Sequence, residues 1–164
     1  MSDYFRLNGD LPSHLVIDST YLLPAFGVEI DFETAEGITR LLGELISKGS
    51  HIYISDLSPL ECFLKAFALA EKERSAEGMT AARTGFLAVT RETSTFTTLP
   101  YRDEKILTEA FTIRSSHRDP FDCFIFATAK MLDAALVTED DKAGRYVNPD
   151  NVLSWKKLRN LIVS

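Results

Sequence analysis

Two aspartates of this chain stand directly after short apolar runs. Asp18 follows the run 15–17, and Asp140 comes two residues after the run 134–138. A buried strand needs no charge at its end, so a carboxylate there either caps a following helix or holds a cation. Capping of a short helix through Tyr21–Phe26 explains Asp18 equally well, and a solvated loop explains Asp140, which has acidic neighbours.

Two further acids belong to segments that are typical of helix starts. In the first segment Ser58 is the expected N-cap, Pro59 the first helical residue and Glu61 the third, which is the arrangement of a capping box. Asp119 and Asp122 have the same spacing around a second proline. Capping and the helix dipole alone account for such acids, with a stabilisation of about 0.5–2 kcal/mol.

Taken together, the four acids predict a metal site. They stand at strand ends or helix starts, and carboxylates that lie close together repel one another unless a cation neutralises them. Oxygen ligands are those that Mg²⁺ and Mn²⁺ prefer. The three histidines have no metal-ligand spacing, so we do not expect zinc and interpret the histidines as structural or solvent-facing. The candidate ligands are Asp18, Glu61, Asp122 and Asp140.

The elements that position these acids follow from the hydrophobic pattern. Short apolar runs without polar alternation are typical of parallel strands that are buried on both faces. Such runs predict strands at 15–17, 52–54, 96–99 and 135–137, with a fifth, weaker one at 152–155. Helical spacing predicts helices over 38–46, 60–68, 76–90 and 121–132. This alternation predicts an α/β fold, a three-layer α/β/α sandwich with a central parallel sheet of four or five strands, which binds ligands beyond the carboxyl ends of its strands.

The composition is that of one folded domain. The chain has 164 residues, 45% of them hydrophobic, which is enough for a core, and its net charge of −6 argues against a basic nucleic-acid clamp. Cys62 and Cys123 lie in apolar helical stretches, so we expect buried free thiols and a reducing compartment. Without a membrane span or a signal peptide, we expect a cytoplasmic protein with no membrane partner. The expected domain is 1–164, with 1–12 as an N-terminal extension.

Four segments in a fixed order carry a resemblance to a known family. The most specific is His-Arg-Asp-Pro-Phe-Asp at 117–122 followed by Ala-Thr-Ala at 127–129. The shorter ones are 15–23, 54–61 and 136–140. With these segments the chain resembles PIN-domain ribonucleases, most of all the VapC-type toxins of toxin–antitoxin pairs.

The resemblance implies a metal-dependent endoribonuclease. It would cleave single-stranded or structured RNA with a metal-activated water, leave a 5′-phosphate, and use Mg²⁺ or Mn²⁺ as its cofactor. The catalytic and metal-binding residues that the resemblance implies are Asp18, Glu61, Asp122 and Asp140.

Some positions of this assignment have competitors or helpers. Asp122 is selected over Asp119 because the family's acid stands just before an Ile-x-Ala-x-Ala stretch. A Thr-x-Asp match selects Asp140, with Asp141 as the alternative. Thr20 and Thr138 offer hydroxyls beside the acids, and these two residues are interpreted as supporting the site.

The resemblance also implies partners, namely an RNA substrate, an antitoxin protein and a second copy in a homodimer. Apolar residues between 60 and 90 fit either a partner surface or plain core: Phe63, Phe67, Leu69, Met79, Phe86 and Leu87. Basic residues near the acids either contact phosphates or are simply solvated: Lys65, Arg114, Arg118, Lys130, Lys142 and Arg145.

Two other functions fit parts of this pattern. A catalytically silent PIN-fold interaction module needs no complete acidic set, yet none of the four acids is missing. A relative of flap-type DNA nucleases needs an inserted arch or a DNA-binding helical module, for which 164 residues leave little room.

Overall fold

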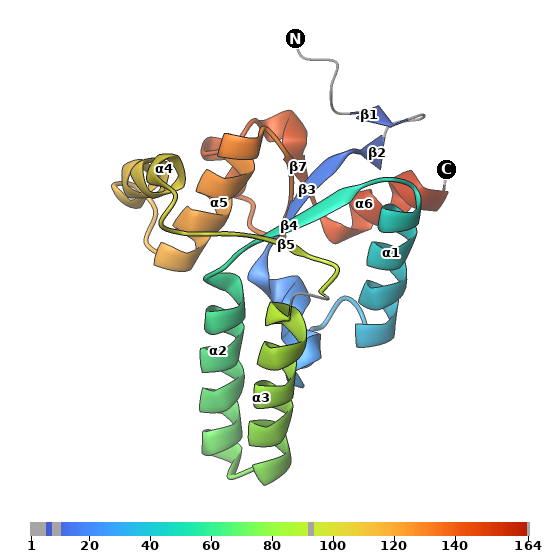
Figure 1. Ribbon diagram of the computed structural model, residues 1–164, viewed down its shortest axis with the longest axis vertical. Helices are drawn as coiled ribbons and strands as arrows, with labels where there is room; N and C mark the ends of the chain where they lie inside the picture. The colour runs from blue at the N-terminus through green and yellow to red at the C-terminus, as the bar shows by residue number, and fades with distance from the viewer. Residues whose placement is uncertain (1–5, 8–10, 92–93, 164) are drawn as a thin grey trace.

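A five-stranded parallel sheet forms the centre of the protein (Figure 1). The structure is a computed structural model and describes residues 6–7, 11–91 and 94–163. The strand order is β5-β4-β3-β6-β7, and every neighbouring pair is parallel, which confirms the predicted α/β sandwich. The strands are β3 (His14–Ile17), β4 (His51–Ser55), β5 (Thr97–Leu99), β6 (Ala135–Val137) and β7 (Val152–Leu153).

Helices connect and cover these strands. A 3-10 helix, η2 (Ser19–Phe26), follows β3 directly, and two shorter ones, η3 (Ala143–Arg145) and η4 (Pro149–Asn151), lie between β6 and β7. The α-helices are α1 (Ala35–Ser47), α2 (Ser58–Glu73), α3 (Ala76–Thr90), α4 (Glu104–Arg114), α5 (Pro120–Leu132) and α6 (Trp155–Val163).

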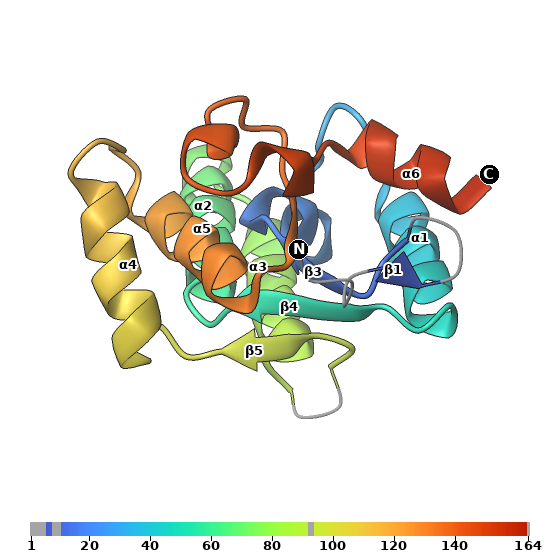
Figure 2. The ribbon, with the colours of Figure 1, turned by 90° about the horizontal axis from the view of Figure 1, so that it is seen from above.

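Two hydrophobic cores lie on opposite faces of the sheet, because successive side chains of a strand point to opposite sides. Leu15 and Ile17 of β3 belong to the first core, which contains residues of η2, α1, α2, α3 and α6. Val16, between them, belongs to the second core, formed with α4 and α5. Figure 2 shows α4 and α5 on one side of the strands and α1 and α6 on the other.

The C-terminal part of the chain differs from the sequence-based expectation, whereas the N-terminal extension stays a prediction. The expected extension 1–12 lies partly outside the described residues, and its described part forms a small antiparallel pair, β1 (Arg6–Leu7) and β2 (Leu11–Pro12). The expected strand 152–155 stops at Leu153, and Trp155 already begins α6. Neither α4 nor α6 was predicted.

A buried aromatic pair attaches α6 to the rest of the domain. The ring of Trp155 stacks on Tyr21 with a centroid distance of 4.9 Å. Glu139 Oε1 accepts hydrogen bonds from the Tyr21 hydroxyl, 2.9 Å away, and from the Trp155 backbone N–H, 2.7 Å away. Glu33 Oε2 accepts a further one from Trp155 Nε1 at 3.1 Å. Glu139 thereby links the loop after β6 to both aromatic residues.

The helices α2 and α3 form an antiparallel hairpin that projects from the sheet in Figure 1. Phe63 stacks on Phe67 within α2 and meets Phe86 of α3 edge to face, with centroid distances of 5.6 and 5.7 Å. These three rings are half-buried, so part of the apolar surface of the hairpin serves to pack α2 against α3. Leu69 and Leu87 remain exposed.

Cys62 and Cys123 are buried free thiols, as predicted. Burial raises the pKa of both thiols, which keeps them in the unreactive protonated form. Within the described ranges, none of the helices has the length and apolar character that crossing a membrane requires.

Candidate metal centre

Asp18 lies at the carboxyl end of β3, where the register joins it to the end of β6. Ile17 pairs with Val137, and the Asp18 backbone N–H continues the ladder with a 3.0 Å bond to the Val137 carbonyl. Its buried carboxylate accepts a 2.6 Å hydrogen bond from Thr138 Oγ1 through Oδ2. Its Oδ1 accepts from the Thr20 backbone N–H at 3.2 Å and so caps η2. Asp18 therefore caps η2 and also lies beside the carboxyl end of β6.

Asp140 is the acid of the β6 loop that turns toward the site. Its backbone N–H donates to Thr138 Oγ1 at 3.1 Å, so one hydroxyl positions both Asp18 and Asp140. Asp140 Oδ1 accepts from the Lys142 backbone N–H at 2.8 Å. Asp141, the alternative acid, is exposed and does not join the cluster described below.

Asp122 is presented by the first turn of α5. Asp119 is the N-cap, as predicted, and its Oδ1 accepts from the Phe121 and Asp122 backbone N–H groups at 2.8 and 3.4 Å. The Asp122 carboxylate is therefore not needed for capping. Burial, with the nearby Asp119 and Asp18 carboxylates, raises the pKa of Asp122 to about 6, although a hydrogen bond from His117 opposes this shift.

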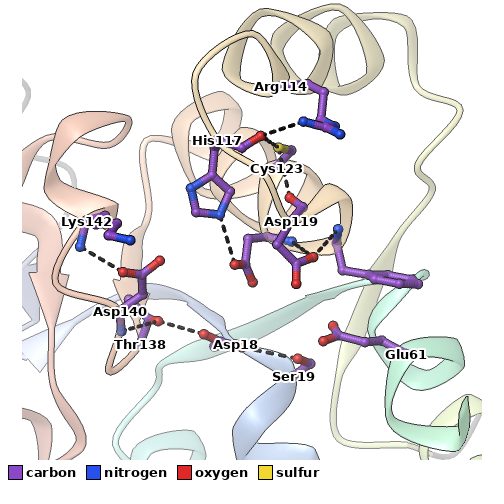
Figure 3. A network of polar contacts seen from close by, with 12 residues as sticks. Asp18, Ser19, Glu61, Arg114, His117, Asp119, Cys123, Thr138, Asp140 and Lys142 are labelled. Atoms are coloured by element: carbon purple, nitrogen blue, oxygen red, sulfur yellow. Dashed lines mark hydrogen bonds and ion pairs between the residues drawn. The ribbon is translucent and has the colours of Figure 1, made fainter. Parts of the chain in front are cut away.

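The structure places His117 beside two of the predicted acids, although sequence reasoning did not include it in the site. Its imidazole is buried, and Nε2 lies 2.9 Å from Asp122 Oδ2, within hydrogen-bond distance. One ligand atom each of His117, Asp122 and Asp140 lie within 4.8 Å of one another (Figure 3). Sequence reasoning missed this residue because its partner is five positions away across a helix start, a spacing that matches no regular element.

Glu61 lies in the first part of α2, and this helix begins one residue earlier than predicted. The N-cap of α2 is Leu57, whose backbone is already helical (φ −80°, ψ −22°), so Ser58 is the first helical residue and not the cap. Glu61 is consequently the fourth helical residue, and no capping box forms. Its Oε1 accepts from Lys65 Nζ, whereas Oε2 is buried without a hydrogen-bond partner among the described residues.

The donor set fits a divalent cation. Figure 3 shows the carboxylates of Asp18, Glu61 and Asp140 facing a common space below His117. Glu61 Oε2 is buried without a hydrogen-bond partner among the described residues although Lys65 pairs with Oε1, and burial raises the pKa of the Asp122 carboxyl group, so neither carboxylate is fully satisfied by the described chain. A cation at this position would relieve both.

The basic residues near the site differ in their contacts. Lys65 pairs with Glu61 at the site itself. Lys130 pairs instead with Glu109 at 2.6 Å, and the Arg114 side chain donates to the His117 carbonyl at 3.0 Å. Arg118 and Arg145 are exposed. Lys65, Lys130 and Arg114 thus already bind protein groups, so the exposed Arg118 and Arg145 are better candidates for contacts with phosphates.

Fold and site define an α/β protein with an acidic, cation-fitting centre at the carboxyl edge of its parallel sheet. The sequence matches the family model for the PIN domain over residues 15–148, and the chain belongs to this family. The resemblance seen in the sequence is thus confirmed. No curated protein matches the chain.

A solved structure with a TM-score above 0.5 agrees with this assignment of the fold. VapBC2 from Rickettsia felis, bound to a DNA fragment from its promoter, is 15% identical with a TM-score of 0.56, covering 87% of this chain and 98% of that one. A toxin–antitoxin complex from Klebsiella pneumoniae is 16% identical with a TM-score of 0.48, covering 85% of this chain and 95% of that one.

Proposed function

We propose that this protein is a metal-dependent endoribonuclease that cleaves single-stranded or structured RNA. The observation that carries the proposal is the convergence of Asp122, Asp140 and His117 beside Asp18, at the carboxyl edge of a PIN-domain sheet. Membership of the PIN family and the group of His117, Asp122 and Asp140 that could hold a metal ion support hydrolysis of a phosphodiester over a purely structural role.

In this proposal Asp18, Glu61, Asp122 and Asp140 hold Mg²⁺ or Mn²⁺. A divalent ion at such a site lowers the pKa of a water and neutralises charge on the phosphate. Thr138 keeps the Asp18 carboxylate in place through its 2.6 Å hydrogen bond, and Thr20 supports it from η2. Asp140 is half-exposed and the Lys65 side chain is 53% exposed, so both are accessible to an RNA strand.

The first test is cleavage of a mixed-sequence single-stranded RNA with Mg²⁺, with Mn²⁺ or with EDTA. We expect cleavage that requires the ion, leaves 5′-phosphate ends and falls at least about 100-fold in Asp18→Asn, beyond what loss of a merely supporting group costs. A flap DNA substrate in the same assay tests the DNA-nuclease alternative. If no substrate is cut and calorimetry detects no ion binding, the interaction-module alternative replaces the proposal.

We further propose that the protein is the toxin of a toxin–antitoxin pair and forms a homodimer. The structural likeness to VapBC2 supports the former. For the dimer, Leu60 and Leu64 lie one turn apart on α2 and are 41% and 51% exposed, and they suit an interface better than the half-buried Phe67 and Phe86.

Replacing Leu60 and Leu64 together with lysine is expected to convert a dimer to a monomer, because an apolar interface cannot bury two unpaired ammonium groups. Light scattering after size-exclusion chromatography measures the mass. Phe111→Lys is the matched control, since Phe111 is 67% exposed but lies on α4. A dimer that survives the double replacement would locate the interface elsewhere, and a monomeric wild type would end this proposal.

A further inference from the structure

His117 lies beside the predicted acids but is not one of the four predicted ligands. Its Nε2 atom is 2.9 Å from Asp122 Oδ2, and the His117 ligand atom lies within 4.8 Å of that of Asp140. Two neighbouring ligands of a six-coordinate ion, with bonds of about 2.1 Å, are about 3 Å apart. The nitrogen and the carboxylate oxygen therefore have the separation of two ligands of one ion.

The imidazole is held in this position by its surroundings. Phe126 and Tyr146 pack edge to face against the ring, with centroid distances of 5.3 and 5.4 Å. The backbone is fixed as well, because His117 N donates to the Ile113 carbonyl and His117 O accepts from Arg114 Nη1, both at 3.0 Å. A ring fixed on this many sides presents its nitrogen without a large loss of rotamer entropy.

A second group indicates independently that the same space receives a cation. Glu61 is 2% exposed, and although Lys65 Nζ pairs with its Oε1, its Oε2 has no hydrogen-bond partner among the described residues. Figure 3 shows the Glu61 carboxylate directed into the space bounded by Asp18, Asp140 and His117. A buried carboxylate oxygen without a donor is costly unless a positive charge satisfies it.

We infer that His117 is a nitrogen ligand of the metal centre, which makes this a mixed nitrogen–oxygen site that selects Mn²⁺ over Mg²⁺. Imidazole is a ligand of first-row transition ions, whereas Mg²⁺ keeps to oxygen. The inference rests on the proposed function for the presence of the ion, and it adds the class of ion and one ligand. The competing interpretation is that His117 donates a hydrogen bond to Asp122 and only orients it.

Two measurements on the full chain separate these interpretations. The first is the electron spin echo envelope modulation of Mn²⁺ bound to the wild-type protein, which detects a directly bonded ¹⁴N. The second is calorimetric binding of Mn²⁺ and of Mg²⁺ to wild type, His117→Asn and His51→Asn. Asparagine keeps an N–H donor for Asp122 but removes the imidazole, and His51 is an exposed residue of β4 that serves as the matched control.

We expect ¹⁴N modulation in wild type and in His51→Asn and its loss in His117→Asn. The variant should bind Mn²⁺ at least about 10-fold more weakly while its Mg²⁺ affinity changes less than about 3-fold, as loss of a nitrogen ligand requires. Absence of ¹⁴N modulation in Mn²⁺-loaded wild type overturns the inference. So does an equal loss of both affinities, the result expected for a residue that only orients Asp122.

Failure of this inference is distinguishable from failure of the proposed function. RNA cleavage without ¹⁴N modulation would leave the nuclease intact and remove His117 from the ligands. Modulation without cleavage would leave the mixed-ligand centre and remove the nuclease. A wild-type protein that binds no Mn²⁺ contradicts both. The wild-type spectrum does not depend on whether any variant folds.

Discussion

Asp122→Asn is expected to abolish RNA cleavage and at the same time to make the metal-free protein more stable. The loss of cleavage should exceed about 100-fold, the upper range for groups that only support a ligand. The gain in stability comes from the pKa of Asp122, which burial and the Asp119 and Asp18 carboxylates raise to about 6. A raised carboxyl pKa means that the ionised form is less favourable in the folded chain than in the unfolded chain.

The pH dependence of the stability gain follows from this sign. In the wild type the penalty is absent below the unfolded pKa of about 4, grows as the pH rises to about 6, and is complete above that value. Asparagine removes the charge and keeps an acceptor for the 2.9 Å contact with His117. We therefore expect Asp122→Asn to unfold with a free energy about 1–3 kcal/mol higher than wild type at pH 7.5, and with little difference at pH 4.

Thermal or urea unfolding in EDTA, followed at both pH values, measures this difference. Asp31→Asn is the matched control, because Asp31 is an exposed turn residue between η2 and α1 and should change neither stability nor cleavage much. Added Mn²⁺ should reverse the order of stability, since only the wild type gains binding free energy from a complete ligand set. An Asp122→Asn protein less stable than wild type in EDTA at pH 7.5 would show that the folded chain does not disfavour the ionised Asp122 carboxylate.

Gly85→Ala is expected to have the largest effect on folding. In α3 this glycine lies against the backbone of η2, and an added Cβ would be 2.4 Å from the Ala25 carbonyl oxygen and 2.8 Å from Phe26 Cα. Backbone atoms at such distances cannot turn away as a flexible side chain can. We expect a loss of about 2–3 kcal/mol in the free energy of unfolding, the upper part of the range for overpacking.

Gly43→Ala is the matched control for this experiment. Gly43 lies inside α1, and an added Cβ there would meet nothing within 4 Å. Alanine should therefore stabilise the protein by about 0.5–1 kcal/mol, because it restricts the unfolded chain. Urea titrations of the two variants should thus move in opposite directions. If both variants changed the free energy of unfolding equally, the Cβ at position 85 would be accommodated by a movement of α3 away from η2 that costs no stability.

Much of the fold follows from local patterns in the sequence, because β3, β4 and β6 are mainly apolar and four helices have a clear apolar face. The edge strand β5 differs from the expectation of burial on both faces, since Thr97 and Thr98 are exposed. The other two helices escape such reasoning for different reasons. In α4 only Ile106, Ala110 and Ile113 are buried, so its apolar stripe is narrow. At α6 the β-prone residues around Trp155 resemble a strand, and tertiary hydrogen bonds to Glu139 and Glu33 favour the helix.

The candidate site was predictable where chain topology alone brings residues together. Asp18 and Asp140 follow adjacent parallel strands, so their proximity follows from the strand order. The position of His117 depends on how α5 packs against the sheet, and that packing involves Phe126 and Tyr146, neither of which is a predicted site residue. Ser58 failed as a cap because Leu57 takes up the helical conformation one residue earlier, a preference that no pattern of residue types records.

The two hydrophobic cores supply different parts of the candidate site. Glu61 belongs to α2, whose buried residues join the first core, whereas His117 and Asp122 flank the start of α5, which packs in the second. Asp18 stands on the strand between the two. A nascent chain that has folded only one of these layers on the ribosome therefore lacks the ligands that the other layer supplies. If the protein is a nuclease, its synthesis endangers the translating cell only after the last layer closes, which leaves an interval in which an inhibitor can engage it.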